Sequence, residues 1–251
     1  MIPIKNEREL EVMRQACKIT AAARALAGDM VRPGVTTKEI DKAVHDYIVA
    51  QGSKPSFLNY QGYPASACIS VNNVVIHGIP DGYKLQEGDI VSVDVGAFWK
   101  GFHGDCAATF ACGRISPTAE KLISVTKQSF FEGLQFARQG HRVSDISHAV
   151  QTYVEKNGFS VVRAFVGHGV GEKLHEEPEV PNFGSPGRGP RLIKGMTLAF
   201  EPMVNVGAYD VRVLKDRWTT VTADGSLSAH YENTVLITDG EPEILTVTEG
   251  L

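Results

Sequence analysis

The sequence predicts an α+β protein in which two helices followed by strands occur twice, with the helices covering one face of an antiparallel sheet. The main observation is an internal repeat. Residues 32–52 align without a gap on residues 138–158, and seven of the twenty-one positions are identical. We therefore expect residues 1–251 to form one domain built of two structural repeats, at about 7–115 and 116–248.

Helical patterns open each half. Residues 7–30 predict a first helix, and residues 117–137 predict its counterpart. The repeated segment is a second helix in each half, because its apolar residues recur at i, i+3, i+4, i+7 and i+8. The expected ends of these second helices are the N-cap residues Thr37 and Ser144 and the C′ residues Gly52 and Gly158.

Strand-like segments follow the helices in both halves. The candidates are residues 67–76, 89–98, 103–111, 161–166, 197–205 and 228–238. Asp94 alternates with valines and is expected on the opposite face of its strand from them. A hairpin through Trp99, Lys100 and Gly101 would bring Asp94 close to Asp105.

The bulk composition is that of a globular protein, with 43% hydrophobic and 22% charged residues among 251. A net charge of −4 gives no general attraction to nucleic acid or an anionic membrane, and no apolar run is long enough for a membrane helix. The cysteines lack the paired spacing of a structural zinc site and favour the reducing cytoplasm; they are Cys17, Cys68, Cys106 and Cys112. A monomer is the default expectation.

Acidic residues recur at matching places in the two halves. Residues 87–95 align with 194–202, setting Asp94 against Glu201, and a later alignment sets Asp105 against Glu232. A single Asp on a strand is usually a turn or surface residue, but four matched carboxylates on apolar strands would repel one another without cations. Two divalent cations would cancel the four charges, and a bridging hydroxide between them would make a hydrolytic site.

Histidines near these acids are candidates for the same site. His168 lies between two glycines, which allow close backbone approach and let its ring reach a cleft as a nitrogen ligand. His103 and His230 precede acids by two residues on the same strand face. For both we expect support of neighbouring ligands rather than metal binding.

Several motifs then resemble one family. NNVVIHGIP (72–80), VSVDVGAFWKGFHGD (91–105), GHGVGEKLHEEP (167–178) and FEPM (200–203) are similar to those of type I methionine aminopeptidases, which have the pita-bread fold. The resemblance runs from about residue 4 to residue 248. It implies five metal ligands, namely Asp94, Asp105, His168, Glu201 and Glu232. Asp105 and Glu232 would bridge two metal ions, Asp94 would hold one ion, and His168 with Glu201 would hold the other.

The resemblance also implies an activity. Such an enzyme removes the N-terminal methionine from nascent proteins and peptides whose second residue is small, using two divalent ions (Co, Mn, Fe or Zn) and a metal-bound hydroxide. Glu201 would move the proton, while His77 and His175 would hydrogen-bond the substrate and the tetrahedral intermediate. The implied methionine pocket consists of Tyr60, Tyr63, Cys68, Leu174 and Trp218. Cys68 would either contact the thioether of the substrate methionine or only pack against its protein neighbours. Nascent chains, met at the ribosome, are the expected partners.

The sequence departs from the family pattern at four positions. Phe57 stands where a small residue is frequent, Leu174 where Phe is usual, and His230 and Asn233 where Gln and His are common. These changes are expected to retune the pocket or the metal preference. One rival is a prolidase or creatinase relative, which usually carries a sizeable N-terminal domain. The other is a non-catalytic protein or RNA binder, which tends to lose metal ligands.

Overall fold

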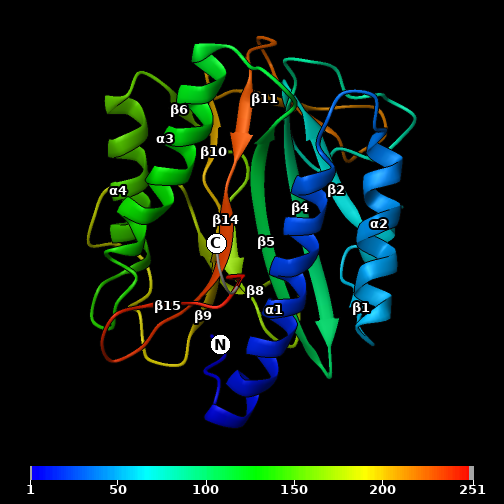
Figure 1. Cartoon of the computed structure of the whole chain (residues 1–251). Coiled ribbons are helices and arrows are strands. Elements are labelled where there is room, and N and C mark those ends of the chain that lie inside the picture. Colours follow the sequence, from blue (N-terminus) through cyan, green and yellow to red (C-terminus); the bar gives the residue numbers. More distant parts are fainter. Residues whose placement is uncertain (1, 249–251) are drawn as a thin grey trace.

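Four long helices pack on one side of a large antiparallel sheet (Figure 1). The computed structural model describes residues 2–248. The helices are α1 (Glu7–Met30), α2 (Thr37–Ala50), α3 (Pro117–Leu134) and α4 (Val143–Lys156). α1 packs against α2 and α3 against α4, so each half of the chain supplies one helix pair. The predicted α+β class, with helices on one face, is confirmed.

The main sheet has the strand order β1-β4-β5-β14-β9-β7-β8, with β2 added beside β4 and β15 beside β14. Its strands are β1 (Lys54–Pro55), β2 (Ala67–Val71), β4 (Ile90–Trp99), β5 (Phe102–Ala111), β7 (Gly167–Gly169), β8 (Glu176–Val180), β9 (Thr197–Phe200), β14 (Glu232–Leu236) and β15 (Glu243–Ile244). β5 from the first half pairs with β14 from the second half at its centre. Carboxylates from the two halves therefore meet on neighbouring strands.

Two smaller sheets flank the main one. They contain β13 (Ser228–His230), β10 (Met203–Asn205) and β6 (Ser160–Val161), and β11 (Val211–Val213), β12 (Thr220–Thr222) and β3 (Val74–Ile76). A short 3₁₀ turn, η1 (Tyr60–Gly62), lies between β1 and β2. No helix within residues 2–248 combines the length and the apolar character that a membrane span requires.

The predicted helices are present, with small errors at their ends. α1 covers residues 7–30 as expected, whereas α3 stops at Leu134 instead of residue 137. Gly52 and Gly158 follow the second helices with φ of 67° and 84°, the left-handed conformation that suits a C′ glycine.

The predicted N-caps are wrong by one and two residues. Thr36 and Arg142 are the caps, instead of Thr37 and Ser144. The Thr36 hydroxyl accepts a hydrogen bond from the Glu39 amide, and the Glu39 carboxylate accepts one from the Thr36 amide. This capping box begins one residue before the predicted cap. The Ser144 hydroxyl instead donates to a loop carbonyl at 2.8 Å.

Three predicted strands are broken, and one is largely absent. The segment 67–76 turns at Asn72, which has a φ of 56°, and 197–205 breaks at Glu201. The segment 228–238 breaks at Tyr231. At each break the chain leaves one sheet for another. Of 161–166 only the first residue is in a strand, and the remainder leads into the cavity described below.

The core lies between the helices and the main sheet. The valines of β4 pack under α1 and α2 together with Ile40 and Val44. Phe130 of α3 stacks on Phe200 of β9 with ring centroids 4.2 Å apart. Because the helices cover this face, the alternate residues of β4, including Asp94, point to the opposite face, as predicted. The hairpin β4–β5 also turns where predicted, with Trp99 paired to Phe102.

Candidate metal centre

Strand register places three of the carboxylates on one face. Asp94 in β4 lies directly opposite Ala107 in β5, and Glu232 in β14 lies opposite the same Ala107 from the other side. Directly opposite residues of antiparallel strands project to the same face. Asp105 precedes Ala107 by two residues and therefore shares that face. The first and second halves thus contribute acids to one row across β4, β5 and β14.

The imidazole and the fourth carboxylate come from β7 and the end of β9. His168 pairs with Ala199, and Glu201 follows Ala199 by two residues. A side chain at either neighbouring glycine would clash with backbone, because a Cβ on Gly167 would lie 2.4 Å from the Ala199 carbonyl oxygen. A Cβ on Gly169 would lie 2.3 Å from another carbonyl. The close approach expected of these glycines is confirmed.

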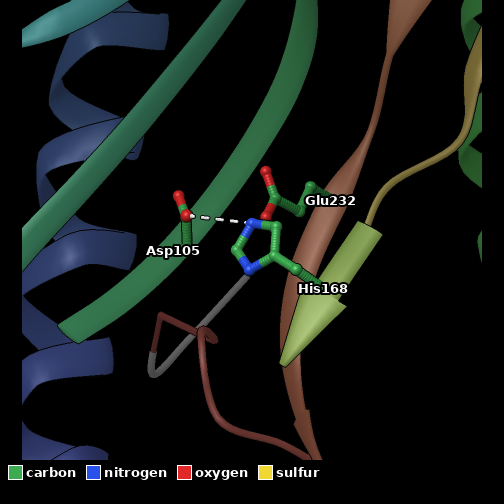
Figure 2. A group of neighbouring side chains, drawn as sticks. All are labelled: Asp105, His168 and Glu232. Atoms are coloured by element: carbon green, nitrogen blue, oxygen red, sulfur yellow. Dashed lines mark ion pairs between the residues drawn. The ribbon is translucent and has the colours of Figure 1, made fainter. Parts of the chain in front are cut away.

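The His168 ring points between the acids (Figure 2). Its Nε2 lies 3.8 Å from Oδ2 of Asp105 and 3.6 Å from Oε1 of Glu201. Its Nδ1 lies 2.8 Å from the Gly169 carbonyl oxygen, to which it donates a proton. That hydrogen bond leaves the lone pair on Nε2, the nitrogen that faces the carboxylates.

Buried polar atoms without partners mark the same place. Among residues 2–248, Oδ1 of Asp94, Oδ1 of Asp105 and Oε1 of Glu232 are buried and accept no hydrogen bond. Oxygens of this kind are costly to bury unless they bind a donor or a cation. One donor atom each from Asp105, His168 and Glu232 lies within 4.8 Å of the others. The side chains therefore fit a metal ion by their chemistry and their spacing.

Burial shifts the ionisation of the whole group. It raises the pKa of Asp105 and of Glu232 well above the usual range, and the neighbouring carboxylates raise both further. Burial also raises the pKa of Asp94 and Glu201. It lowers the pKa of His168 to about 3, which keeps this imidazole neutral. The acids would hold protons without a cation, and a bound cation would replace those protons.

All twelve residues expected at the site line one cavity of about 210 Å³. They are Asp94, Asp105, His168, Glu201, Glu232, His77, His175, Tyr60, Tyr63, Cys68, Leu174 and Trp218. The cavity also includes Phe57, noted above as a departure from the family pattern. Sequence reasoning missed Gln61, Ile76, Phe165 and Val166. Ile76 could have been found because it adjoins His77. Phe165 and Val166 end the segment 161–166, which was wrongly expected to be a strand, and nothing in the sequence pointed to Gln61.

Two further histidines border the carboxylates. His175 lies with its ring centroid 4.2 Å from that of His168, and its Nδ1 is 2.6 Å from the Tyr60 hydroxyl. His77 has a φ of 58°, a left-handed conformation that is uncommon outside glycine, and its ring meets Trp218 edge-on. Burial lowers the pKa of His77 to about 4 and also lowers that of His175. The His77 imidazole is therefore neutral at pH 7.

The other end of the cavity is apolar. Phe57, Tyr63, Cys68 and Leu174 form one buried cluster, against which Trp218 packs. The Tyr63 hydroxyl shares its one proton between two backbone carbonyls at 3.1 and 2.9 Å, which directs its ring into the cluster. Cys68 lies directly opposite Asp94 in the β2–β4 pair, so the apolar wall adjoins the acidic row.

An open hollow of about 680 Å³ adjoins this cavity. Val166, His168 and His175 line both spaces. Its outer wall carries acidic residues and Lys5, whose ammonium group forms a buried ion pair with Glu176 at 2.5 Å. The small cavity and the larger surface groove are therefore adjacent, with the two histidines between them.

The pita-bread fold and the buried carboxylate–imidazole face together define a metal-dependent peptidase. Residues 11–239 match the model of metallopeptidase family M24, and the chain belongs to that family. It is 58% identical to a methionine aminopeptidase of Clostridium perfringens over 247 residues, which cover 98% of this chain and 99% of the relative. The crystal structure of the methionine aminopeptidase from Thermotoga maritima superposes with a TM-score of 0.97 at 44% identity, covering 99% of this chain and 100% of that one.

A more distant likeness separates fold from activity. The prolidase from Pyrococcus furiosus superposes with a TM-score of 0.81 at 22% identity, covering 98% of this chain and 66% of the prolidase. At that identity the similarity shows a common fold. The chain therefore shares its scaffold with a prolidase but resembles methionine aminopeptidases along its whole length.

Proposed function

We propose that this chain is a methionine aminopeptidase, which hydrolyses the peptide bond after an N-terminal methionine when the second residue is small. The observation that carries the proposal is the junction of two surfaces in one cavity. A row of buried carboxylates adjoins an apolar end formed by Tyr63, Cys68 and Leu174. Such a junction suits a short apolar side chain next to the bond that is cleaved.

We propose that five residues hold two divalent ions, with Asp105 and Glu232 shared between them. Asp94 completes the site of one ion, while His168 and Glu201 complete the other. Two ions would balance the four carboxylate charges. When bound, the ions supply an activated water and polarise the scissile carbonyl. Mn, Fe, Co and Zn all suit this set of donors, since it combines an imidazole with carboxylates.

The protein's own groups would move protons and orient the substrate. Glu201 follows β9 in the cavity wall, where its carboxylate would accept a proton and pass it to the leaving amine. Tyr60 fixes the ring of His175 through its hydrogen bond. The other nitrogen of that ring would then donate to the developing oxyanion. His77 would hydrogen-bond the substrate amide.

The apolar end of the cavity would select methionine. Phe57 and Leu174 occupy this end together, with Trp218 edge-on to Tyr63 at a centroid distance of 5.1 Å. A cavity of about 210 Å³ that also contains the metal donors leaves little room for a large second residue. The rest of the polypeptide would lie in the adjoining open hollow.

We further propose that residues 1–251 act as one catalytic domain of two repeats, as a monomer, on nascent polypeptides as they leave the ribosome. Neither nucleic acid nor membrane is needed for this activity. The cytoplasm is the proposed location, supported by four cysteines that are all free thiols. The net charge of −4 likewise provides no general attraction to nucleic acid.

Turnover on short peptides tests the proposal. Metal-depleted protein would be reloaded with Mn²⁺, Fe²⁺, Co²⁺ or Zn²⁺ and given Met-Xaa-Ser peptides in which Xaa increases in size. We expect free methionine to be released with Gly, Ala or Ser as Xaa and little release with Leu or Phe. Xaa-Pro dipeptides serve as the comparison. Faster cleavage of these dipeptides than of Met-Ala-Ser would contradict the proposal in favour of a prolidase.

A further inference from the structure

His230 is a second imidazole inside the carboxylate site. It ends β13, two residues before Glu232, and it is only 2% exposed. Its backbone is fixed on both sides, because the Thr109 hydroxyl donates to the His230 carbonyl and accepts from its amide, each at 2.9 Å. The ring is therefore held at this depth by the pairing of the two halves.

The inner nitrogen of His230 has no hydrogen-bond partner. Its Nε2 is fully buried, and it lies 3.5 Å from Oε2 of Glu201 and 3.9 Å from Oε2 of Glu232. Both distances exceed the usual range of about 2.7–3.2 Å for an N–H···O hydrogen bond. A ring that only oriented one carboxylate would hydrogen-bond that carboxylate, and Nε2 of His230 hydrogen-bonds neither.

The spacing instead matches donors placed around a shared cation. Two donors each about 2.1 Å from a tetrahedral metal ion lie about 3.4 Å apart. His168, expected from the sequence to be a ligand, shows the same pattern, with its Nε2 3.6 and 3.8 Å from two carboxylates. The Glu201 carboxylate thus lies between two imidazoles, with one facing each oxygen.

The sequence-related histidine of the first half behaves differently. His103 precedes Asp105 by two residues, as His230 precedes Glu232. Its Nδ1, however, lies 2.8 Å from the Ser56 hydroxyl, and its ring packs on Phe98 with centroids 4.6 Å apart. His103 is thus satisfied by protein groups, whereas Nε2 of His230 is not.

We propose that His230 is a direct metal ligand through Nε2, a sixth donor to the site, instead of the supporting residue that its sequence position predicts. The donors then form two groups that share Glu232. One contains Asp105 and His168, and the other contains Glu201 and His230. This inference rests on the proposed metal-dependent function and revises the division of its donors, because His168 now groups with Asp105 while His230 takes the place beside Glu201.

The second imidazole has a consequence for metal choice. A neutral ring adds a donor without adding charge, so two divalent ions still balance four carboxylates. Imidazole favours Zn, Fe and Ni over metals such as Mn and Mg, which prefer an all-oxygen environment. The site should therefore discriminate against Mn²⁺ more strongly than a variant that lacks the His230 ring.

The test counts imidazole ligands directly. X-ray absorption at the zinc edge would be recorded on the native chain, His230→Gln and His103→Gln, each loaded with two equivalents of Zn²⁺. We expect imidazole scattering from two histidines per chain in the native protein and in His103→Gln, and from one in His230→Gln. Calorimetric titration should also show Zn²⁺ affinity falling at least about tenfold in His230→Gln, and Mn²⁺ affinity falling less.

One imidazole per chain in the native protein would overturn the inference, even if His230→Gln weakened binding. This native measurement decides the matter even if His230→Gln fails to fold. A native chain that binds none of Zn²⁺, Mn²⁺, Fe²⁺ and Co²⁺ in the titrations would instead refute the proposed metal-dependent function itself. The two failures are therefore distinguishable in one experiment.

Discussion

Asp94 and Glu232 lie on either side of Ala107, each directly opposite it in an adjacent strand. The two acids belong to different halves of the chain, and only a methyl group stands between them in the row. Adjacent strands are about 4.8 Å apart, so the two backbones are about 10 Å apart and leave space for ions above Ala107. The small side chain at this position is therefore part of the site.

Enlarging Ala107 should impair metal binding. We expect Ala107→Val to lower metal affinity by at least about tenfold, because two added methyl carbons would enter the space left for the ions, where overpacking costs about 1–3 kcal/mol. Calorimetric titration with Co²⁺ measures this. Ala111→Val is the control, since Ala111 is exposed on the same strand and the same face. Equal affinities in the two variants would show that the row does not confine the ions.

The metal-free protein should lose stability as the pH rises. Folding raises the pKa of Asp94 to about 7 and that of Glu201 to about 8, whereas unfolded carboxyl groups titrate near 4. Between these values the unfolded chain holds fewer protons than the folded one, so the free energy of unfolding decreases with pH. Below about pH 6.5 buried neutral histidines such as His77 and His168 act in the opposite direction, because they take up protons only on unfolding. We therefore expect a loss of at least about 1 kcal/mol from pH 7 to pH 9 in urea titrations.

Saturating divalent metal should reverse this trend, since the ions replace the protons and bind better at higher pH. The same urea titrations with Co²⁺ present test the reversal. A metal-free protein whose stability rises over this pH interval would contradict the assignment of protonated acids to the site.

Replacing Glu201 by Gln should remove proton transfer. We expect kcat to fall by about 10²–10⁴-fold in Glu201→Gln, because the amide cannot accept the proton at neutral pH. Bound metal must be quantified in the same sample, since Glu201 is also a proposed ligand. Near-native turnover with metal bound would show that another group moves the proton.

Removing the Tyr60 hydroxyl should loosen His175. The hydrogen bond of 2.6 Å between them is lost in Tyr60→Phe, and we expect kcat to fall by about three- to tenfold, the value of one hydrogen bond. Steady-state kinetics with Met-Ala-Ser measures the effect. Tyr83→Phe is the matched control, because the Tyr83 hydroxyl donates a hydrogen bond to Asp89 outside the cavity. Identical kcat values in the two variants would exclude an orienting role for Tyr60.

The buried pair Lys5–Glu176 should matter for stability. Both side chains are about 5% exposed or less, so Lys5→Met leaves a carboxylate buried without its partner. We expect the free energy of unfolding to fall by about 3–5 kcal/mol. Lys42→Met breaks an exposed pair with Asp46 and should cost less than about 1 kcal/mol. Similar losses in urea titrations of the two variants would contradict this reasoning.

The four carboxylates could be predicted because the repeat aligned them before any contact was known. Alternation in β4 fixed the face of Asp94, and the glycines beside His168 indicated close packing of its strand. The helical pattern likewise predicted both ends of α1 correctly. These signals are local or duplicated, so one sequence contains them.

Changes of sheet were not predictable. Apolar runs continue through Asn72, Glu201 and Tyr231, and nothing in their pattern shows that the chain leaves the main sheet there. The environment of His230 was hidden for the same reason. It follows from pairing with Thr109, 121 residues away, and its likeness to His103 suggested a supporting role.

The central claim is that metal ions bound on the sheet face of Asp94 and Glu232 are required for the release of N-terminal methionine. Release of methionine from Met-Ala-Ser, measured together with metal content before and after chelation, tests it most directly. We predict no release by the chelated protein and recovery when Mn²⁺, Fe²⁺, Co²⁺ or Zn²⁺ is restored. Undiminished release by protein shown to be free of metal, or no release with any of the four ions bound, would contradict the claim.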